Sequence, residues 1–238
     1  MNLATFYDAV RAPVFGGKLS QSQVDGMGFL LSAMEKAHWP IAHAAYGLAT
    51  AFHETARTML PIAEYGKGKG KAYGVPDKKT GQTYYGRGYV QLTWLFNYEK
   101  AQDELGQPLV SNPDLAMRAD IAADVMVRGM QEGWFTGKAN RAYLDKAPPD
   151  YVNARRIING TDKAALIAGY ATKFEAALKA SGYGAPVPAN TPDAVPVEAL
   201  PQALPEPPPA TVRVEPIPNP SFLSRFFSAL ARRLKGAA

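Results

Sequence analysis

Apolar residues recur every three or four positions over much of the first 184 residues, and this spacing predicts a chain built mainly from helices. One stripe follows Ser20, which can cap a helix, and another follows Pro40, which suits a first helical turn. The second stripe lies in a run without Asp, Glu, Lys or Arg from 37 to 53, so we expect a buried helix. The two stripes comprise Val24, Met27, Leu31 and Met34, and then Ile41, Ala45, Leu48 and Phe52.

A third helix is predicted after Thr93, which we expect to be its cap, with Gly106 at its end. Its apolar stripe is Trp94, Tyr98, Ala101 and Leu105. Later helices are expected at about 113–132, 149–158 and 162–180. Only 82–92, with several β-prone residues, is typical of a short hairpin or strand. The pattern therefore predicts a mainly α fold with a small β element beside a cleft, over residues 1–184.

The composition changes after Gly184, because the 36 residues 185–220 hold 12 of the 20 prolines. Such a segment cannot bury enough apolar surface to fold, so we expect a disordered, extended linker. Residues 221–238 then predict a basic amphipathic helix that binds an anionic bacterial membrane, although docking on the catalytic domain or a partner protein would use the same face. The expected membrane-binding residues are Phe222, Arg225, Phe226, Phe227, Leu230, Arg232, Arg233 and Lys235, with Leu223 and Leu234 on the apolar side.

Composition narrows the class of partner. The net charge of +5 favours a polyanion, which could be nucleic acid, anionic lipid or bacterial wall. The basic residues form no aromatic-interleaved stripe on a recognised module, so we expect no nucleic-acid partner. The absence of cysteine fits synthesis in a reducing cytoplasm. The N-terminus lacks the features of a secretory signal, so we expect another factor to release the protein.

His53-Glu54 resembles the start of a zinc-protease motif, but the second histidine that this motif needs is replaced by Arg57. We therefore expect neither a metal site nor a cofactor. A glycosidase instead needs two carboxyl groups in unlike surroundings. Glu54 follows an apolar helix face, which would keep it protonated as an acid, and Glu64 precedes a Gly- and Lys-rich loop, which would keep it ionised as a base. Each could equally be a solvated surface glutamate.

Several motifs together resemble glycoside hydrolase family 19, which includes chitinases and many phage endolysins. Their order and spacing are specific, and they span about 110 residues. The motifs are His53-Glu54-Thr55, Tyr84-Tyr85-Gly86-Arg87-Gly88-x-x-Gln91-Leu92-Thr93, Asn97-Tyr98, Asn112-Pro113-Asp114-Leu115 and Ile157-Ile158-Asn159-Gly160.

The resemblance implies a lysozyme-like α-helical domain and an inverting reaction, with Glu54 as the acid and Glu64 as the base. Inversion places a water between carboxyls roughly 6.5 to 9.5 Å apart. Thr93 matches the hydroxyl that helps to hold this water. Gln91, Asn97 and Asn159 match positions that hydrogen-bond N-acetyl sugars.

The two tyrosines Tyr84 and Tyr85 are expected to offer faces for sugar stacking, with burial in a hairpin as the alternative. Arg87 is expected to anchor a buried carboxylate rather than to touch sugar.

The missing cysteines and the compressed segment after Glu54 favour bacterial peptidoglycan over chitin as substrate. The interpretation that follows is a monomeric muramidase, an endolysin of the lysozyme type that acts at the periplasmic cell wall and aids host lysis. The alternatives are a chitinase, a lytic transglycosylase, and a membrane-active wall-binding protein with an inactive glycosidase domain.

Overall fold

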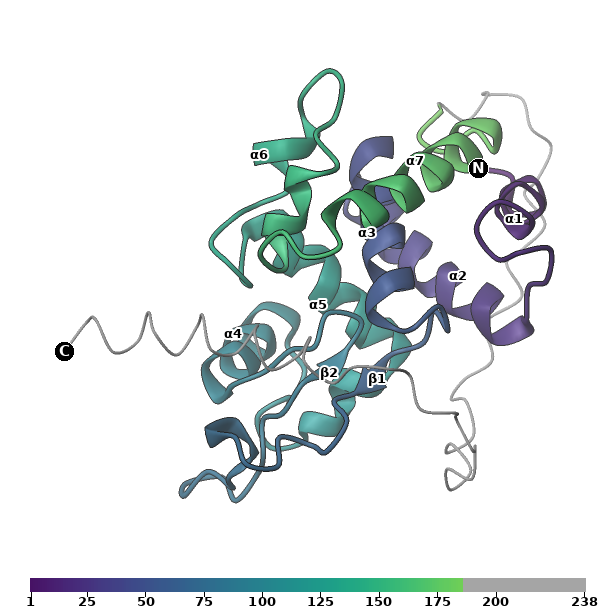
Figure 1. The fold of residues 1–238 in the computed structure, drawn as a ribbon. Helices are drawn as coiled ribbons and strands as arrows, with labels where there is room; N and C mark the ends of the chain where they lie inside the picture. Colours follow the sequence, from purple (N-terminus) through teal and green to yellow (C-terminus); the bar gives the residue numbers. More distant parts are fainter. Residues whose placement is uncertain (186–238) are drawn as a thin grey trace. The chain divides into compact units, whose positions relative to one another are not determined.

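The computed structural model describes residues 1–185, which form a mainly helical domain with one antiparallel pair of short strands (Figure 1). The predicted fold class is confirmed. The expected linker from 186 onward and the expected helix at 221–238 lie outside the described residues. The elements are α1 (Leu3–Arg11), α2 (Gln21–Lys36), α3 (Ile41–Glu54), β1 (Ile62–Ala63), η1 (Ala72–Gly74), β2 (Arg87–Gly88), α4 (Leu95–Leu105), η2 (Pro113–Met117), α5 (Ala119–Glu132), α6 (Arg141–Leu144), η3 (Asn153–Ile157) and α7 (Ala164–Ala180).

The helix α3 forms the centre of the main core. Its residues 43–52 are all buried, as the run without charged side chains predicted. It packs chiefly on α7, which also packs on α1, while α2 packs on α5. Many of its side chains are small, so neighbouring backbones can approach closely. This packing fixes the end of α3, and Glu54 is its last residue. Among residues 1–185, no helix is long and apolar enough to cross a membrane.

Both predicted starts of α2 and α3 are confirmed. Ser20 caps α2 through a full capping box with Gln23, in which each side chain binds the other's backbone N–H. Pro40 directly precedes α3. The predicted end of α4 at Gly106 is also confirmed, since this glycine adopts the left-handed conformation that closes a helix.

Three predicted helices need correction. The stretch 113–132 is divided at Arg118, whose extended backbone separates the 3-10 turn η2 from α5. The stretch 149–158 contains only the 3-10 turn η3, and α7 begins at Ala164 rather than at 162. The first helix, α1, was not predicted, although Asn2 caps it by accepting a hydrogen bond from the backbone of Thr5.

The prediction that Thr93 caps a helix is wrong. The helix α4 begins at Leu95, and its N-cap residue Trp94 has a positive φ of 76°. The Thr93 hydroxyl donates instead to the carbonyl of Gln91 at 2.7 Å. The predicted β element is present in a smaller form, because β2 pairs with β1 and a single bridge joins Arg87 to Leu92.

A strained turn follows Glu54. Ala56, Arg57 and Met59 all have positive φ, a conformation that costs about 1 kcal/mol or more for each non-glycine residue. The helix α2 holds this turn from outside. Its Gln23 amide donates to the carbonyl of Arg57 at 2.9 Å, and a Cβ on Gly26 would lie 1.9 Å from the carbonyl oxygen of Met59. Direct backbone contact with α2 therefore fixes the turn.

We expect Gly26→Ala to lower the free energy of unfolding by about 1–3 kcal/mol, because its methyl group would displace the turn at Met59. Gly28→Ala in the same helix is the matched control, since its nearest neighbour would be the Tyr7 hydroxyl at 3.6 Å. The control should be neutral or stabilise the domain by up to about 1 kcal/mol, through better helix propensity. Urea unfolding measures both, and equal effects would contradict the close contact.

Candidate active site

Glu54 forms a buried ion pair. Its Oε1 accepts a hydrogen bond from the Arg155 guanidinium at 2.5 Å, and the side chains are 10% and 0% exposed. Arg155 lies in η3, and its Nε also donates to the carbonyl of Asp162, just before α7. The expectation of purely apolar surroundings for Glu54 is therefore wrong, because its carboxylate contacts a cation. The pair joins the end of α3 to the segment that leads into α7.

The surroundings of this ion pair are buried and polar. Tyr46 and Thr50 precede Glu54 at helical spacing, so the three lie on one face of α3, and both are fully buried. Burial raises the pKa of Tyr46, and the nearby charge of Arg155 opposes this rise. Burial lowers the pKa of His53, which favours its neutral form, while the Glu54 carboxylate acts in the opposite direction.

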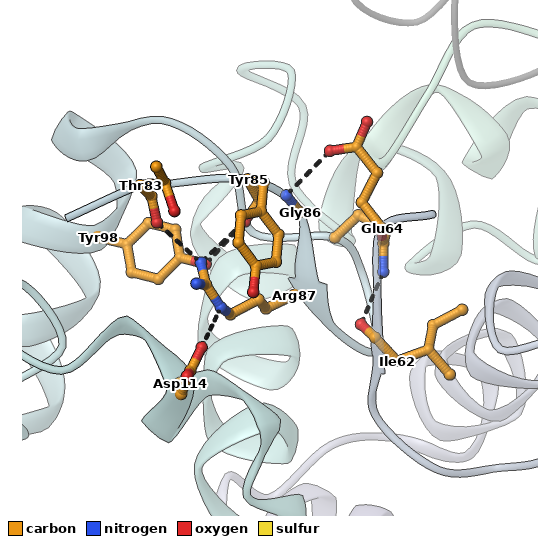
Figure 2. A network of polar contacts seen from close by, with 9 residues as sticks. Ile62, Glu64, Thr83, Tyr85, Gly86, Arg87, Tyr98 and Asp114 are labelled. Atoms are coloured by element: carbon orange, nitrogen blue, oxygen red, sulfur yellow. Dashed lines mark hydrogen bonds and ion pairs between the residues drawn. The ribbon is translucent and has the colours of Figure 1, made fainter. Parts of the chain in front are cut away.

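Glu64 is also buried, but its partners are uncharged. It follows β1 directly, and the strand register places it opposite Gly86, whose carbonyl accepts from the Glu64 backbone N–H at 2.7 Å. One carboxylate oxygen accepts from the Tyr73 hydroxyl at 2.8 Å and the other from the Gly86 N–H at 3.3 Å. Figure 2 shows this side chain reaching toward Gly86. The carboxylate is held by donors from two segments.

The residues Gln91 and Thr93 gather at the same place. A Cβ on Gly86 would lie 2.7 Å from Gln91 Oε1 and 3.3 Å from Thr93 Oγ1, so all three are in close contact. The Gln91 amide nitrogen donates to the Ile62 carbonyl in β1 at 3.0 Å. A side chain at 86 would crowd these groups and would require the Gln91 amide to move. The structure therefore brings Glu64, Gln91 and Thr93 together around one glycine.

The two predicted asparagines have local partners. Asn97, in α4, donates through its amide to the Thr93 carbonyl at 2.8 Å, and this contact links it to the Gly86 cluster. Asn159 follows η3, and its side-chain oxygen accepts from the Gly160 N–H at 2.8 Å. Its backbone N–H donates to the Arg155 carbonyl, so Asn159 lies on the segment that supplies the partner of Glu54.

The expectation of sugar stacking on Tyr84 and Tyr85 is corrected, because their side chains are buried and only 3% and 7% exposed. The Tyr84 hydroxyl donates to Thr80 and to the Val110 carbonyl, while the Tyr85 ring is covered by the Arg87 guanidinium at 3.6 Å. The alternative, burial beside the hairpin, is what the structure has.

Arg87 organises the motif from inside (Figure 2). Its Nε donates to Asp114 at 2.8 Å, and one terminal nitrogen donates to Tyr98 Oη. The same nitrogen donates to the carbonyls of Thr83 and Tyr85. Arg87 thus anchors a carboxylate, but the expectation that this carboxylate is buried is wrong, because the Asp114 side chain is 75% exposed.

Part of the chain that contains the site is similar to a known family. Residues 47–143, which include Glu54, Glu64 and Thr93, match the family described as class I chitinase, glycoside hydrolase family 19. This segment is similar to family 19. An Arabidopsis thaliana endochitinase is 49% identical over 80 residues, which are 34% of this chain and 25% of that protein. The inactive chitinase-like protein 1 of Hevea brasiliensis is 40% identical over 55 residues, 23% of this chain and 16% of that protein.

The solved structure of chitinase C from Streptomyces griseus has a TM-score of 0.50 and 23% identity, and the match covers 76% of each chain. At that identity the likeness concerns the fold alone. The chain spans about a quarter of the length of the first plant endochitinases that it matches.

The sequence pattern did not predict two residues that contact the carboxylates of the site. Arg155 lies 101 positions from Glu54, outside the matched segment, and Tyr73 lies in the Gly- and Lys-rich connection. One feature of the sequence marked Arg155, namely that it lies close to the apolar residues Ala154 and Ile157. Such neighbours indicate burial, and a buried arginine requires an acidic partner. No comparable signal marked Tyr73.

We expect Arg155→Met to lower the free energy of unfolding by about 3–5 kcal/mol, because it leaves the Glu54 carboxylate buried without its cation. Arg156→Met is the matched control, since Arg156 is exposed, and we expect a change within about 0.5 kcal/mol. Chemical unfolding of both variants, of Glu54→Gln and of the Glu54→Gln/Arg155→Met double variant measures the coupling. Strict additivity of the two single changes would contradict a direct pair.

Proposed function

We propose that this chain hydrolyses the glycan strands of bacterial peptidoglycan as a muramidase, an endolysin of the lysozyme type that acts at the cell wall. The reaction is an inverting hydrolysis, with Glu54 as general acid and Glu64 as general base. The observation that carries this proposal is the position of Glu64, whose carboxylate lies within the cluster of Gly86, Gln91 and Thr93.

This cluster suits a general base. A base must keep a lone pair open to take a proton from water. The Tyr73 and Gly86 donors bind one carboxylate oxygen each, which leaves each oxygen a further lone pair, and they add no positive charge. The Thr93 hydroxyl donates to the Gln91 carbonyl, so its lone pairs can accept a hydrogen bond from the attacking water. In this proposal Gln91, Asn97 and Asn159 supply hydrogen bonds to the N-acetyl sugars.

Two features support peptidoglycan. The chain has no cysteine, and only nine residues separate the two glutamates. A chitin substrate is the second candidate, because relatives with extensive local identity are named endochitinases. The same carboxylate pair would serve either polymer, so the substrate must be determined by assay.

We expect Glu54→Gln and Glu64→Gln each to reduce peptidoglycan hydrolysis by about 10²–10⁴-fold, because each removes a proton-transfer group. Glu99→Gln, on the exposed side of α4, is the matched control and should retain activity. Mass spectrometry of the released strands should find reducing N-acetylmuramic acid ends. Parallel digestion of chitin tests the second candidate.

Two results would overturn parts of this proposal. Anhydromuramic ends, or largely retained activity in Glu64→Gln, would identify a lytic transglycosylase that needs one carboxyl group. A folded, unaltered chain that cleaves neither polymer would indicate an inactive domain, as the name of the Hevea brasiliensis relative says of that protein.

We also propose that residues 221–238 bind an anionic bacterial membrane. The segment has four basic and no acidic side chains, and its apolar residues have the spacing that would put them on one face of a helix. Lipid binding would bring the wall enzyme to a membrane surface without a spanning helix.

Removal of residues 221–238 should weaken binding to vesicles with anionic headgroups, because it deletes both the positive charges and the apolar face. Hydrolysis of isolated peptidoglycan should stay unchanged. Vesicle sedimentation with anionic and with zwitterionic lipid gives the comparison. Unchanged binding to the anionic vesicles would refute the membrane role.

A further inference from the structure

The net positive charge of residues 1–185 arises from one segment of the sequence. Lys67, Lys69, Lys71, Lys78 and Lys79, called here the lysine lobe, lie in the connection between β1 and β2. Residues 67–79 contain these five lysines and one acidic residue, a net charge of +4. Residues 1–185 contain 21 Lys and Arg and 17 Asp and Glu, which is also a net charge of +4. The rest of the domain is therefore neutral overall.

The backbone of the lobe has a defined course. Lys67, Lys69 and Lys71 each donate a backbone hydrogen bond to the carbonyl three residues earlier, which makes three successive turns. The alternating glycines allow these turns because Gly66, Gly68 and Gly70 all have positive φ. A Cβ on Gly74 would lie 2.0 Å from the Gly68 carbonyl oxygen, so two backbone segments of the connection touch. The turns thus give the backbone that carries Lys67, Lys69 and Lys71 a compact course.

The lysines of the lobe are available to a partner. Lys67, Lys69, Lys78 and Lys79 are exposed, and none of the ion pairs found within residues 1–185 includes a lysine of the lobe. The single acidic residue is Asp77, whose Oδ1 accepts hydrogen bonds from Lys79 N, Thr80 N and Thr80 Oγ1. Asp77 therefore shapes the loop rather than pairing with the ammonium groups.

The lobe is joined directly to the candidate base. The backbone N–H of Lys67 donates to the Glu64 carbonyl at 3.0 Å, and Tyr73, from the same connection, donates to the Glu64 carboxylate. Tyr65, between Glu64 and the lysine lobe in the sequence, is 76% exposed. In Figure 1 the connection forms the blue loops that extend away from α2 and α3. A polymer bound at Glu64 would consequently pass beside a concentrated, unpaired positive charge.

We infer that the lysine lobe binds the carboxylates of peptidoglycan next to the cleavage site and selects this anionic glycan over neutral chitin. The inference rests on the proposed function, since it names the substrate class of the same site. Each exposed ammonium–carboxylate contact is weak, but several act together and attract the polymer over a distance set by the ionic strength. A chain of N-acetylglucosamine offers no charge to these lysines.

The test uses the full chain with Glu54→Gln, so that binding is measured without cleavage. The lobe variant carries Lys67→Gln, Lys69→Gln, Lys78→Gln and Lys79→Gln. The matched control carries the same charge change at exposed lysines elsewhere, Lys18→Gln, Lys36→Gln, Lys138→Gln and Lys173→Gln. Sedimentation with purified peptidoglycan, and separately with chitin, is measured at low and at physiological salt.

We expect the lobe variant to bind peptidoglycan about tenfold more weakly at low salt and to lose most of its salt dependence, with the control within about twofold. Chitin binding should not change. The lobe effect should persist on peptidoglycan freed of phosphate polymers and disappear when its carboxyls are converted to neutral amides. Equal losses in lobe variant and control, or an effect that disappears with the phosphate polymers, would overturn the inference.

This outcome is separate from that of the proposed hydrolysis. Carboxylate-dependent binding through the lobe, found together with no cleavage by the unaltered chain, would leave the binding surface standing and refute only the enzymatic activity. Cleavage of peptidoglycan without any lobe effect would support the enzymatic activity and refute the binding surface.

Discussion

Arg155 is fully buried, and a guanidinium cannot lose its proton to relieve its burial, so its position depends on the Glu54 carboxylate. The same side chain donates to the Asp162 carbonyl, at the approach to α7. Since α3 and α7 form the largest helix contact of the domain, this one cation ties the central helix pair together at the end that carries Glu54. Core packing and candidate chemistry therefore share one interaction, and neither can change independently.

The second carboxylate depends on a different constraint, the register of β1 and β2. The pairing of Ala63 with Arg87 places Glu64 opposite Gly86. It also directs the Arg87 side chain toward the carbonyl and tyrosine groups that accept its hydrogen bonds. A shift of one residue would move Glu64 away from the Gly86 N–H and turn the Arg87 side chain to the other face. The short sheet thus positions functional groups more than it contributes buried surface.

The sequence predicted those features that depend on local pattern. The stripes after Ser20 and Pro40 specify helices because their apolar faces match the helical period, and Glu54 was correctly placed at a helix end. Thr93 was misassigned as a cap because its hydroxyl suits either a cap or the turn contact to Gln91, and the positive φ of Trp94 decides between them. No local pattern reports such a backbone choice.

The contacts that complete the site could not be read from the sequence for a related reason. The partner of Glu54 lies 101 residues away, and its approach depends on how η3 and α7 fold back on α3. Tyr84 and Tyr85 had an apolar ring and a polar hydroxyl that fit either sugar stacking or burial, and only the position of Arg87 and Thr80 resolves the choice. The motif indicated which residues matter, while long-range packing determined what each one touches.

The Glu54 and Glu64 carboxylates are held by different kinds of partner. This difference matters because the proposed acid must give a proton and the proposed base must take one. Glu64 has neutral donors, whereas Glu54 has a cation. An ion pair is strongest when the carboxylate is charged, but a proton donor must be neutral when it acts. If Glu54 is the acid, its pair with Arg155 must therefore weaken as substrate binds. The strained turn at Ala56, Arg57 and Met59 follows the proposed acid directly in the chain, and its contacts with α2 hold that side of Glu54 in place.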